Sequence, residues 1–156
     1  MKIPYSISLL AALTSLLFAA GCSEPRDHGK ISNHADHNHT APHGGTLIKL
    51  GHHAYNVELL RDNAAGKLTA WVLDAHAEDF IRIAAPTIEL VAVHGQQSTL
   101  LALQAVAYPA TGEKVGDTSQ FEVQADWLKT AGEFSGTITL EVKGTKFEKV
   151  PYRLAK

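Results

Sequence analysis

Cysteine is almost absent from this chain of 156 residues, which contains only Cys22. A single cysteine cannot form an internal disulfide or a thiolate metal site, so any bound metal would be held by nitrogen and oxygen ligands. A strong net charge is also lacking, since 14 Lys and Arg residues stand against 16 Asp and Glu residues. The basic residues form no cluster, which argues against a nucleic-acid partner.

Catalytic sequence motifs are missing as well. The chain has no Gly-x-Ser-x-Gly elbow, no His-Glu-x-x-His helix, no phosphate-binding Gly-Lys-Ser/Thr loop and no dinucleotide fingerprint. A catalytic zinc also needs rigidly held ligands with one open position, which a flexible histidine segment does not provide. We therefore expect a binding protein and not an enzyme.

The segment 1–21 has the pattern of a signal peptide. Lys2 gives it a positive start, and Ile7 to Ala20 form an uncharged run of apolar and small residues. A membrane-spanning helix needs about 20 apolar residues, so this shorter run is typical of a targeting segment. It ends in Ala19-Ala20-Gly21-Cys22, which resembles the lipobox of bacterial lipoproteins, although that family usually has Leu where this chain has Ala19.

The lipobox resemblance implies cleavage before Cys22, acylation of that cysteine by palmitate-like chains, and a membrane-anchored, periplasm-facing location in the bacterial cell envelope. Ser23 favours the outer membrane, because Asp at this position resembles the inner-membrane retention signal of the family. Contact with the membrane would come from the lipid anchor alone. The alternative is an ordinary cleaved signal peptide followed by an unrelated cysteine.

The mature chain divides by composition into two parts. Residues 22–45 are mostly polar and turn-forming, with Ile31 as the only large apolar residue, which predicts a flexible tether. Residues 46–156 alternate short apolar-rich runs with turn signals, which is typical of an all-β domain. We predict an antiparallel β-sandwich, with an open β-barrel as the alternative.

Eight runs are interpreted as strands, and one short segment as a helical turn. The strands are Thr46–Leu50, Ala54–Leu60, Leu68–Asp74, Thr87–Val93, Thr99–Ala107, Gln120–Ala125, Thr137–Val142 and Lys146–Leu154. Pro151 predicts an edge strand, because proline removes a ladder donor. The helical turn is Asp126–Ala131, with Asp126 as its cap and Gly132 as its end. Trp71, Trp127 and Tyr108 are interpreted as core or packing residues and not as a sugar-stacking platform, since their neighbours alternate as core strands do.

Histidines are concentrated near the tether. Of nine in the chain, seven fall within 28–53, namely His28, His34, His37, His39, His43, His52 and His53. The densest stretch places His34, Asp36, His37 and His39 within six positions. Imidazole and carboxylate groups bind zinc, copper and nickel, and a flexible backbone can bring near neighbours around one ion. The spacing predicts a transition-metal site without selecting the metal. The alternative is a polar spacer that binds metal only weakly.

A second pattern extends from Ala41 to Leu73. It comprises Pro42-His43-Gly44-Gly45, then His52-His53 and then Val57-Glu58-Leu59. This pattern resembles the metal-binding N-terminal segment of periplasmic adaptors of heavy-metal efflux systems, although the chain lacks their long heptad hairpin. The resemblance implies His43 as a ligand with His52 or His53 as partners, and Glu58 as a weaker candidate. The alternative for His43 is a turn residue.

Side chains alternate between the two sides of a strand, so the spacing of these candidates predicts which of them share a side. If the strand is extended from His52, that histidine shares a side with Glu58 and is the better outward ligand. Asp74 with His76, and His94, lie at expected strand ends and are lesser candidates.

Two functions are therefore in competition. The first is an envelope lipoprotein that binds a transition metal through its histidine-rich arm, as a buffer or as a carrier linked to metal-efflux components. The second is a non-metal interaction module whose β domain docks on an envelope protein or a glycan.

Overall fold

The computed structural model describes residues 39–155. The predicted signal peptide, Cys22 and the predicted ligands His34, Asp36 and His37 lie outside this range. The described part contains β1 (Thr46–Leu50), β2 (Tyr55–Asp62), β3 (Lys67–Leu73), β4 (Thr87–His94), β5 (Gln97–Ala105), β6 (Gln120–Gln124), β7 (Phe134–Val142) and β8 (Thr145–Leu154). Two short 3₁₀ helices, η1 (Pro109–Thr111) and η2 (Asp126–Lys129), complete it. None of the helices in this range is long and apolar enough to span a membrane.

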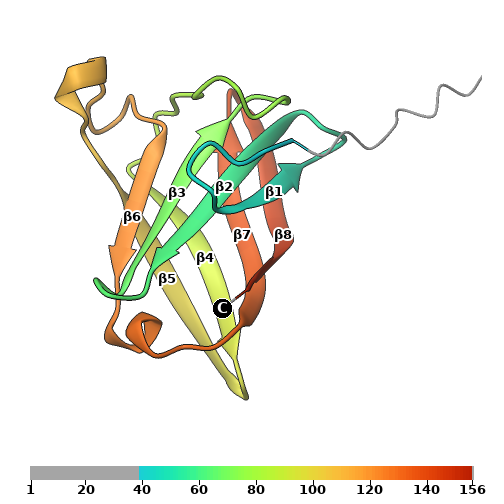
Figure 1. Ribbon diagram of the computed structural model, residues 1–156. Coiled ribbons are helices and arrows are strands. Elements are labelled where there is room, and N and C mark those ends of the chain that lie inside the picture. The colour runs from blue at the N-terminus through green and yellow to red at the C-terminus, as the bar shows by residue number, and fades with distance from the viewer. Residues whose placement is uncertain (1–38, 156) are drawn as a thin grey trace, which may run out of the picture. The chain divides into compact units, whose positions relative to one another are not determined.

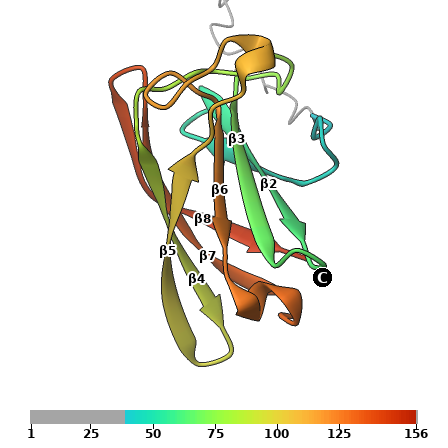
Figure 2. The same ribbon diagram turned by 90° about the vertical axis from the view of Figure 1, so that its left-hand side faces the viewer.

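All eight strands belong to one antiparallel sheet in the order β1-β2-β3-β6-β5-β4-β7-β8 (Figure 1). β1 also lies close to β8, so the sheet is nearly closed into a barrel. Figure 2 shows β6 in front of β7 and β8, with β4 and β5 on one side and β2 and β3 on the other. The prediction of an all-β antiparallel domain is confirmed. Of the two predicted architectures, the β-sandwich and the open β-barrel, the structure has the open barrel, because all eight strands share one sheet.

The strands form where apolar and polar residues alternate. In β7, Ile138, Leu140 and Val142 are buried, while the residues between them are more exposed. This period of two places one face of the sheet in the core and the other in water. β8 is an edge strand, as Pro151 predicted. The strand bounds expected from the sequence agree with the structure within three residues at each end.

The helical turn after β6 differs in detail from its prediction. Asp126 is the first residue of η2, and the capping position belongs to Ala125, which makes no side-chain capping bond. The Asp126 carboxylate instead accepts a hydrogen bond from Lys129 Nζ at 2.8 Å. The helix ends at Lys129 with Thr130 in the C-terminal capping position, and not at Gly132. The predicted capping roles are therefore wrong, because the Asp126 side chain forms a local ion pair instead.

Strand β2 is buried on both faces near its start. Asn56, Val57, Glu58 and Leu59 are all buried in succession. Val57 and Leu59 belong to the core, so the side chain of Glu58 lies on the outer face of the sheet. An outward carboxylate can be buried only if another segment covers it, and that segment precedes β1.

Candidate functional site

A fully buried carboxylate holds the segment that precedes β1. Glu58 has no exposed surface. Its Oε1 accepts hydrogen bonds from the backbone N–H of His43 at 2.9 Å and of Gly45 at 2.8 Å. Its Oε2 lies 2.9 Å from Nδ1 of the His43 ring. Because Glu58 would be costly to bury without donors, these bonds fix the position of the turn.

The Pro-His-Gly-Gly sequence suits this arrangement. The N–H of Gly44 donates to the carbonyl of Ala41 at 3.1 Å, and Gly44 has a φ of 78°, which glycine adopts without steric cost. A Cβ on Gly45 would lie 2.5 Å from the carbonyl oxygen of Leu59. Only glycine therefore allows the chain to approach β2 closely enough to reach Glu58.

Contacts with three residues fix the orientation of the His43 ring. Its Nδ1 donates to Glu58, because a carboxylate can only accept. One ring face stacks on Trp71 with 3.8 Å between centroids, and Phe80 lies 5.7 Å away in a tilted arrangement. The side chain keeps 35% of its surface exposed. This arrangement leaves Nε2 as the lone-pair nitrogen, which is the geometry that a carboxylate gives to metal-binding or hydrogen-bonding histidines.

The strand register explains why these residues meet. Glu58 on β2 is paired with Trp71 on β3, and Trp71 is paired with Gln120 on β6. Residues directly opposite each other on neighbouring antiparallel strands point to the same face of the sheet. Glu58, Trp71 and Gln120 therefore form a row across the outer face, on which the His43 turn rests.

A pocket of about 520 Å³ lies along this row. Four rings contribute to its lining, namely His43, Trp71, Phe80 and Tyr108. Phe80 comes from the loop after β3, and Tyr108 from the loop after β5. Both are about half exposed, at 47% and 52%. For Tyr108 this contradicts the expectation of a core or packing residue, because the loop carries it out of the sheet.

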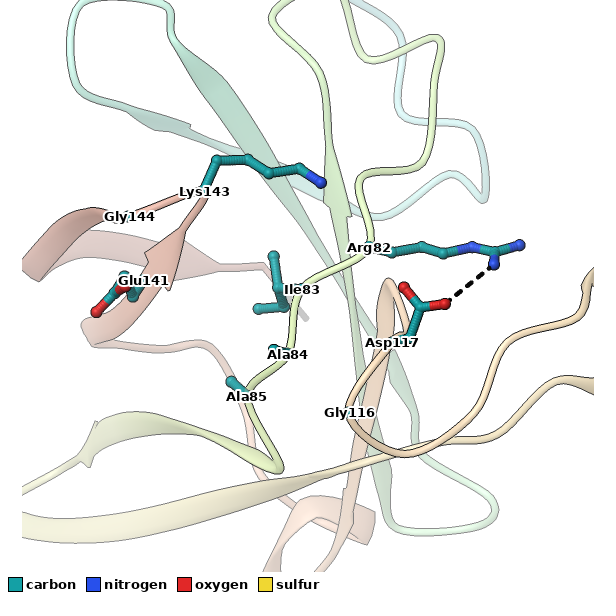
Figure 3. A pocket seen from close by; sticks show the side chains of 9 residues that line it. All are labelled: Arg82, Ile83, Ala84, Ala85, Gly116, Asp117, Glu141, Lys143 and Gly144. Atoms are coloured by element: carbon teal, nitrogen blue, oxygen red, sulfur yellow. Dashed lines mark hydrogen bonds and ion pairs between the residues drawn. The ribbon is translucent and has the colours of Figure 1, made fainter.

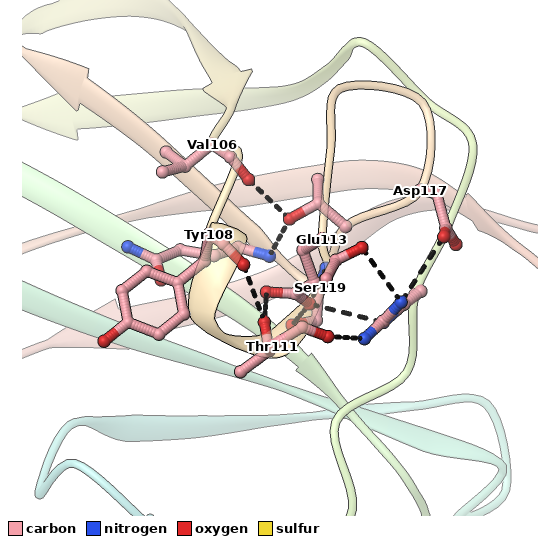
Figure 4. Close-up of polar contacts among 10 residues, drawn as sticks. Val106, Tyr108, Thr111, Glu113, Asp117 and Ser119 are labelled. Carbon is pink, nitrogen blue, oxygen red and sulfur yellow. Dashed lines mark hydrogen bonds and ion pairs between the residues drawn. The ribbon is translucent and has the colours of Figure 1, made fainter.

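The polar wall of the pocket is held by Glu113 (Figure 4). Its Oε1 accepts bonds from the backbone N–H of Ser119 at 3.0 Å and from the Ser119 hydroxyl at 2.6 Å. The Thr111 hydroxyl lies 3.1 Å from Oε2 and 3.0 Å from the Tyr108 carbonyl, so two acceptors share its proton. Burial raises the pKa of Glu113, but bonds from Ser119 and Thr111 and the charge of Arg82 outweigh this and lower the pKa.

Arg82 separates this pocket from a second hollow of about 460 Å³. Figure 3 shows the second hollow, with Lys143 and Arg82 on opposite sides and the Arg82–Asp117 contact of 3.4 Å. The guanidinium also donates to the carbonyls of Thr111 and Gly112. These bonds hold the turn after β5 in place, so Arg82 acts here as a structural residue and not as a free cation.

Three histidines meet near the start of the described chain. The ring of His39 lies 5.5 Å from that of His76 and 6.1 Å from that of His53, measured between centroids. His53 belongs to the turn between β1 and β2 and has a φ of 61°. His76 belongs to the loop after β3. Residues distant in sequence thus bring three imidazoles together, and we call this group the histidine junction.

The loop that carries His76 is held firmly. Asn56 Nδ2 donates to the carbonyls of Asp74 and Ala75 at 2.8 and 3.0 Å. The Asp74 carboxylate accepts the backbone N–H of Glu78 at 2.8 Å. Burial raises the pKa of Asp74, but the backbone bonds and the neighbouring His76 outweigh it, so its pKa lies below the ordinary value.

The predicted ligands have separate positions in the structure. His39 and His53 belong to the histidine junction, His43 to the pocket, and His52 to the exposed turn before β2. The prediction that His52 shares a side of the strand with Glu58 does not apply, because β2 begins only at Tyr55. Glu58 is buried and uses both oxygens on the turn. Within residues 39–155, no three His, Cys, Asp or Glu residues converge closely enough to hold a metal by themselves.

The sequence patterns indicate His76 only as a lesser candidate and do not single out Phe80 or Glu113. All three lie in loops, where neither alternation nor motif spacing shows which strands they will approach. The position of His76 two residues after a strand end was the only available signal. No protein-family model matches the chain, and no curated protein or solved structure is similar enough to count as a match.

Proposed function

We propose that this chain is a lipid-anchored envelope protein, not an enzyme, that binds a zinc, copper or nickel ion through its histidine-rich arm together with histidines of the barrel. It would buffer the ion or pass it to metal-efflux components. The observation that supports this proposal is the histidine junction, where His39 at the end of the arm lies beside both His53 and His76.

The spacing of the junction suits shared coordination. Two imidazoles that bind one tetrahedral ion at about 2.0–2.1 Å have ring centroids about 5 Å apart. The observed separations of 5.5 and 6.1 Å are close to that value, so a small movement of His39 would bring pairs of rings to one ion. His37, two positions before His39, and Asp36 and His34 are the nearest further ligands in the sequence.

The ligand chemistry favours exchange over permanent storage. Without thiolates, a nitrogen and oxygen site binds these ions in the general order that places copper(II) above nickel and zinc. Ligands that come from an arm and from a fixed domain must be brought together when the metal binds, which lowers affinity. Such a site is suited to a buffer or a carrier.

Replacing His53 and His76 together by asparagine is expected to weaken metal binding by about tenfold or more, because two imidazole ligands are lost. Asparagine is chosen because it tolerates the positive φ of His53. The affinity of the mature full chain for zinc, copper and nickel would be measured by competition with a chromophoric chelator.

The matched control replaces His52 and His94 by asparagine. This variant removes the same number of histidines, yet His52 lies outside the junction and His94 lies beside Trp127, with 6.2 Å between their rings. Its affinity should remain that of the parent chain. Equal loss in both double variants would show only a general effect of histidine number, and no loss in either would exclude the barrel from the metal site.

A further inference from the structure

The pocket beside His43 combines flat apolar walls with polar groups. Phe80 and Tyr108 expose about half of their surface, and Trp71 also lines the pocket. Large aromatic side chains left in contact with water favour a ligand that covers their faces. The volume of about 520 Å³ falls in the range of small-molecule sites, which is about 300–1,000 Å³.

The charged side chains that line the pocket, Arg82 and Glu113, already have partners within the protein. Arg82 donates to the carbonyls of Thr111 and Gly112 and contacts Asp117. The Glu113 carboxylate accepts bonds from Ser119. A ligand anion would approach Glu113 without a free cation to pair with, and a ligand cation would face Arg82. The electrostatics therefore favour a neutral ligand.

The pocket also offers free hydrogen-bonding positions. Nε2 of His43 remains an acceptor after Nδ1 has donated to Glu58. The Gln120 amide nitrogen donates to Glu122 at 2.9 Å, which leaves its carbonyl oxygen as a second acceptor. A purely apolar ligand would strip water from these groups without replacing the lost bonds. The ligand should therefore carry hydroxyl donors as well as a flat apolar face.

From these three features we infer that the pocket binds a neutral saccharide unit, such as a hexose or an N-acetylhexosamine. A pyranose ring presents C–H groups on its face and hydroxyl groups at its edge. The face would cover the rings of Phe80 and Tyr108, while the hydroxyl groups would donate to His43 Nε2 and to the Gln120 carbonyl. This inference goes beyond the proposed metal binding, and it does not depend on a bound ion.

The experiment uses the fluorescence of Trp71. Replacing Trp127 by phenylalanine leaves Trp71 as the only tryptophan, since the chain has two. This change is mild because the buried Trp127 Nε1 has no partner among the described residues. The mature full chain with this background substitution would be titrated, with chelator present, with maltotriose, cellotriose, chitotriose and monomeric N-acetylglucosamine.

Saturable changes in Trp71 emission with at least one saccharide are expected. Binding of monomeric N-acetylglucosamine would indicate a free sugar, and binding of trisaccharides alone would indicate a glycan chain. The added substitution Tyr108→Ala should weaken binding about threefold to tenfold, the equivalent of one stacked ring. Leu100→Ala, at a position that is 62% exposed and outside the pocket, should leave binding unchanged.

Two results would overturn the inference. One is the absence of any saturable change with all four saccharides while the chain remains folded by circular dichroism. The other is binding of phenol, used as a purely aromatic probe, in the absence of saccharide binding. Because chelator is present throughout, neither result bears on the proposed metal binding.

Discussion

Replacing Glu58 by alanine should lower the free energy of unfolding by about 3–5 kcal/mol, because a buried carboxylate is removed from three N–H donors. The backbone N–H groups of His43 and Gly45 and the Nδ1–H of His43 would lose their acceptor. The segment 42–45 would then detach from β2, and His43 would lose its stacking on Trp71. Urea denaturation of the mature full chain measures this change.

The substitution Glu58→Gln distinguishes the effect of Glu58 on stability from its effect on the His43 ring. A glutamine oxygen at the Oε1 position can still accept from the backbone N–H groups of His43 and Gly45. Its amide nitrogen at the Oε2 position would donate to Nδ1 of His43, so the ring proton moves to Nε2. We expect a smaller stability loss, of about 1–2 kcal/mol, together with loss of the Nε2 acceptor.

The matched control for both variants is Glu148→Ala, which removes an exposed carboxylate from β8. Exposed ion pairs contribute little, so its urea denaturation midpoint should match that of the parent. A loss below about 1 kcal/mol for Glu58→Ala would contradict the account. It would mean that the turn around His43 is held by contacts other than Glu58.

The strands could be predicted from the sequence because their signal is local. Ile138, Leu140 and Val142 alternate with polar residues, and the turn at Gly144 follows directly. The choice between a sandwich and a barrel depends on pairing between distant strands, such as β3 with β6 and β4 with β7. Alternation carries no information on such pairing, so the sequence left both forms open.

The site was predictable only in part. The pattern around His43 and Glu58 grouped the two residues in one segment, and the structure brings them into contact. The hydrogen bonds between them were not predictable. Alternation along the strand places Glu58 on the outer face of the sheet, where a side chain is ordinarily in contact with solvent. Its burial results from a contact across 15 positions that depends on the small size of Gly45. The approach of His76 to His39 likewise depends on loop geometry.

The substitution Cys22→Ser should move the protein from the membrane fraction to the soluble fraction of bacterial cells. The proposed anchor would consist of two or more acyl chains on this cysteine, and two chains give stable anchoring while one gives only marginal binding. Serine has no thiol to acylate, so essentially all anchoring should be lost. Fractionation without detergent, with the intact mass of the membrane-bound protein, measures both the location and the lipid.

Ser23→Ala is the control, because it changes the neighbouring position and leaves the thiol in place. It should remain in the membrane fraction with the same added lipid mass as the parent. If the parent chain carries no lipid, or if the Cys22→Ser variant stays in the membrane fraction to the same extent, the proposed anchor is wrong. The metal proposal would remain open in either case.

Imidazole nitrogen chemical shifts during a zinc titration report which histidines bind the ion, and so show whether the arm and the barrel share one metal site. The ¹⁵N-labelled mature full chain would be titrated with zinc in substoichiometric steps. We predict that His39, His53 and His76 shift together with arm histidines such as His37, while His52 and His94 remain unchanged. Equal shifts at His94 and the junction, or no shift at His53 and His76, would contradict a metal site shared between the arm and the barrel.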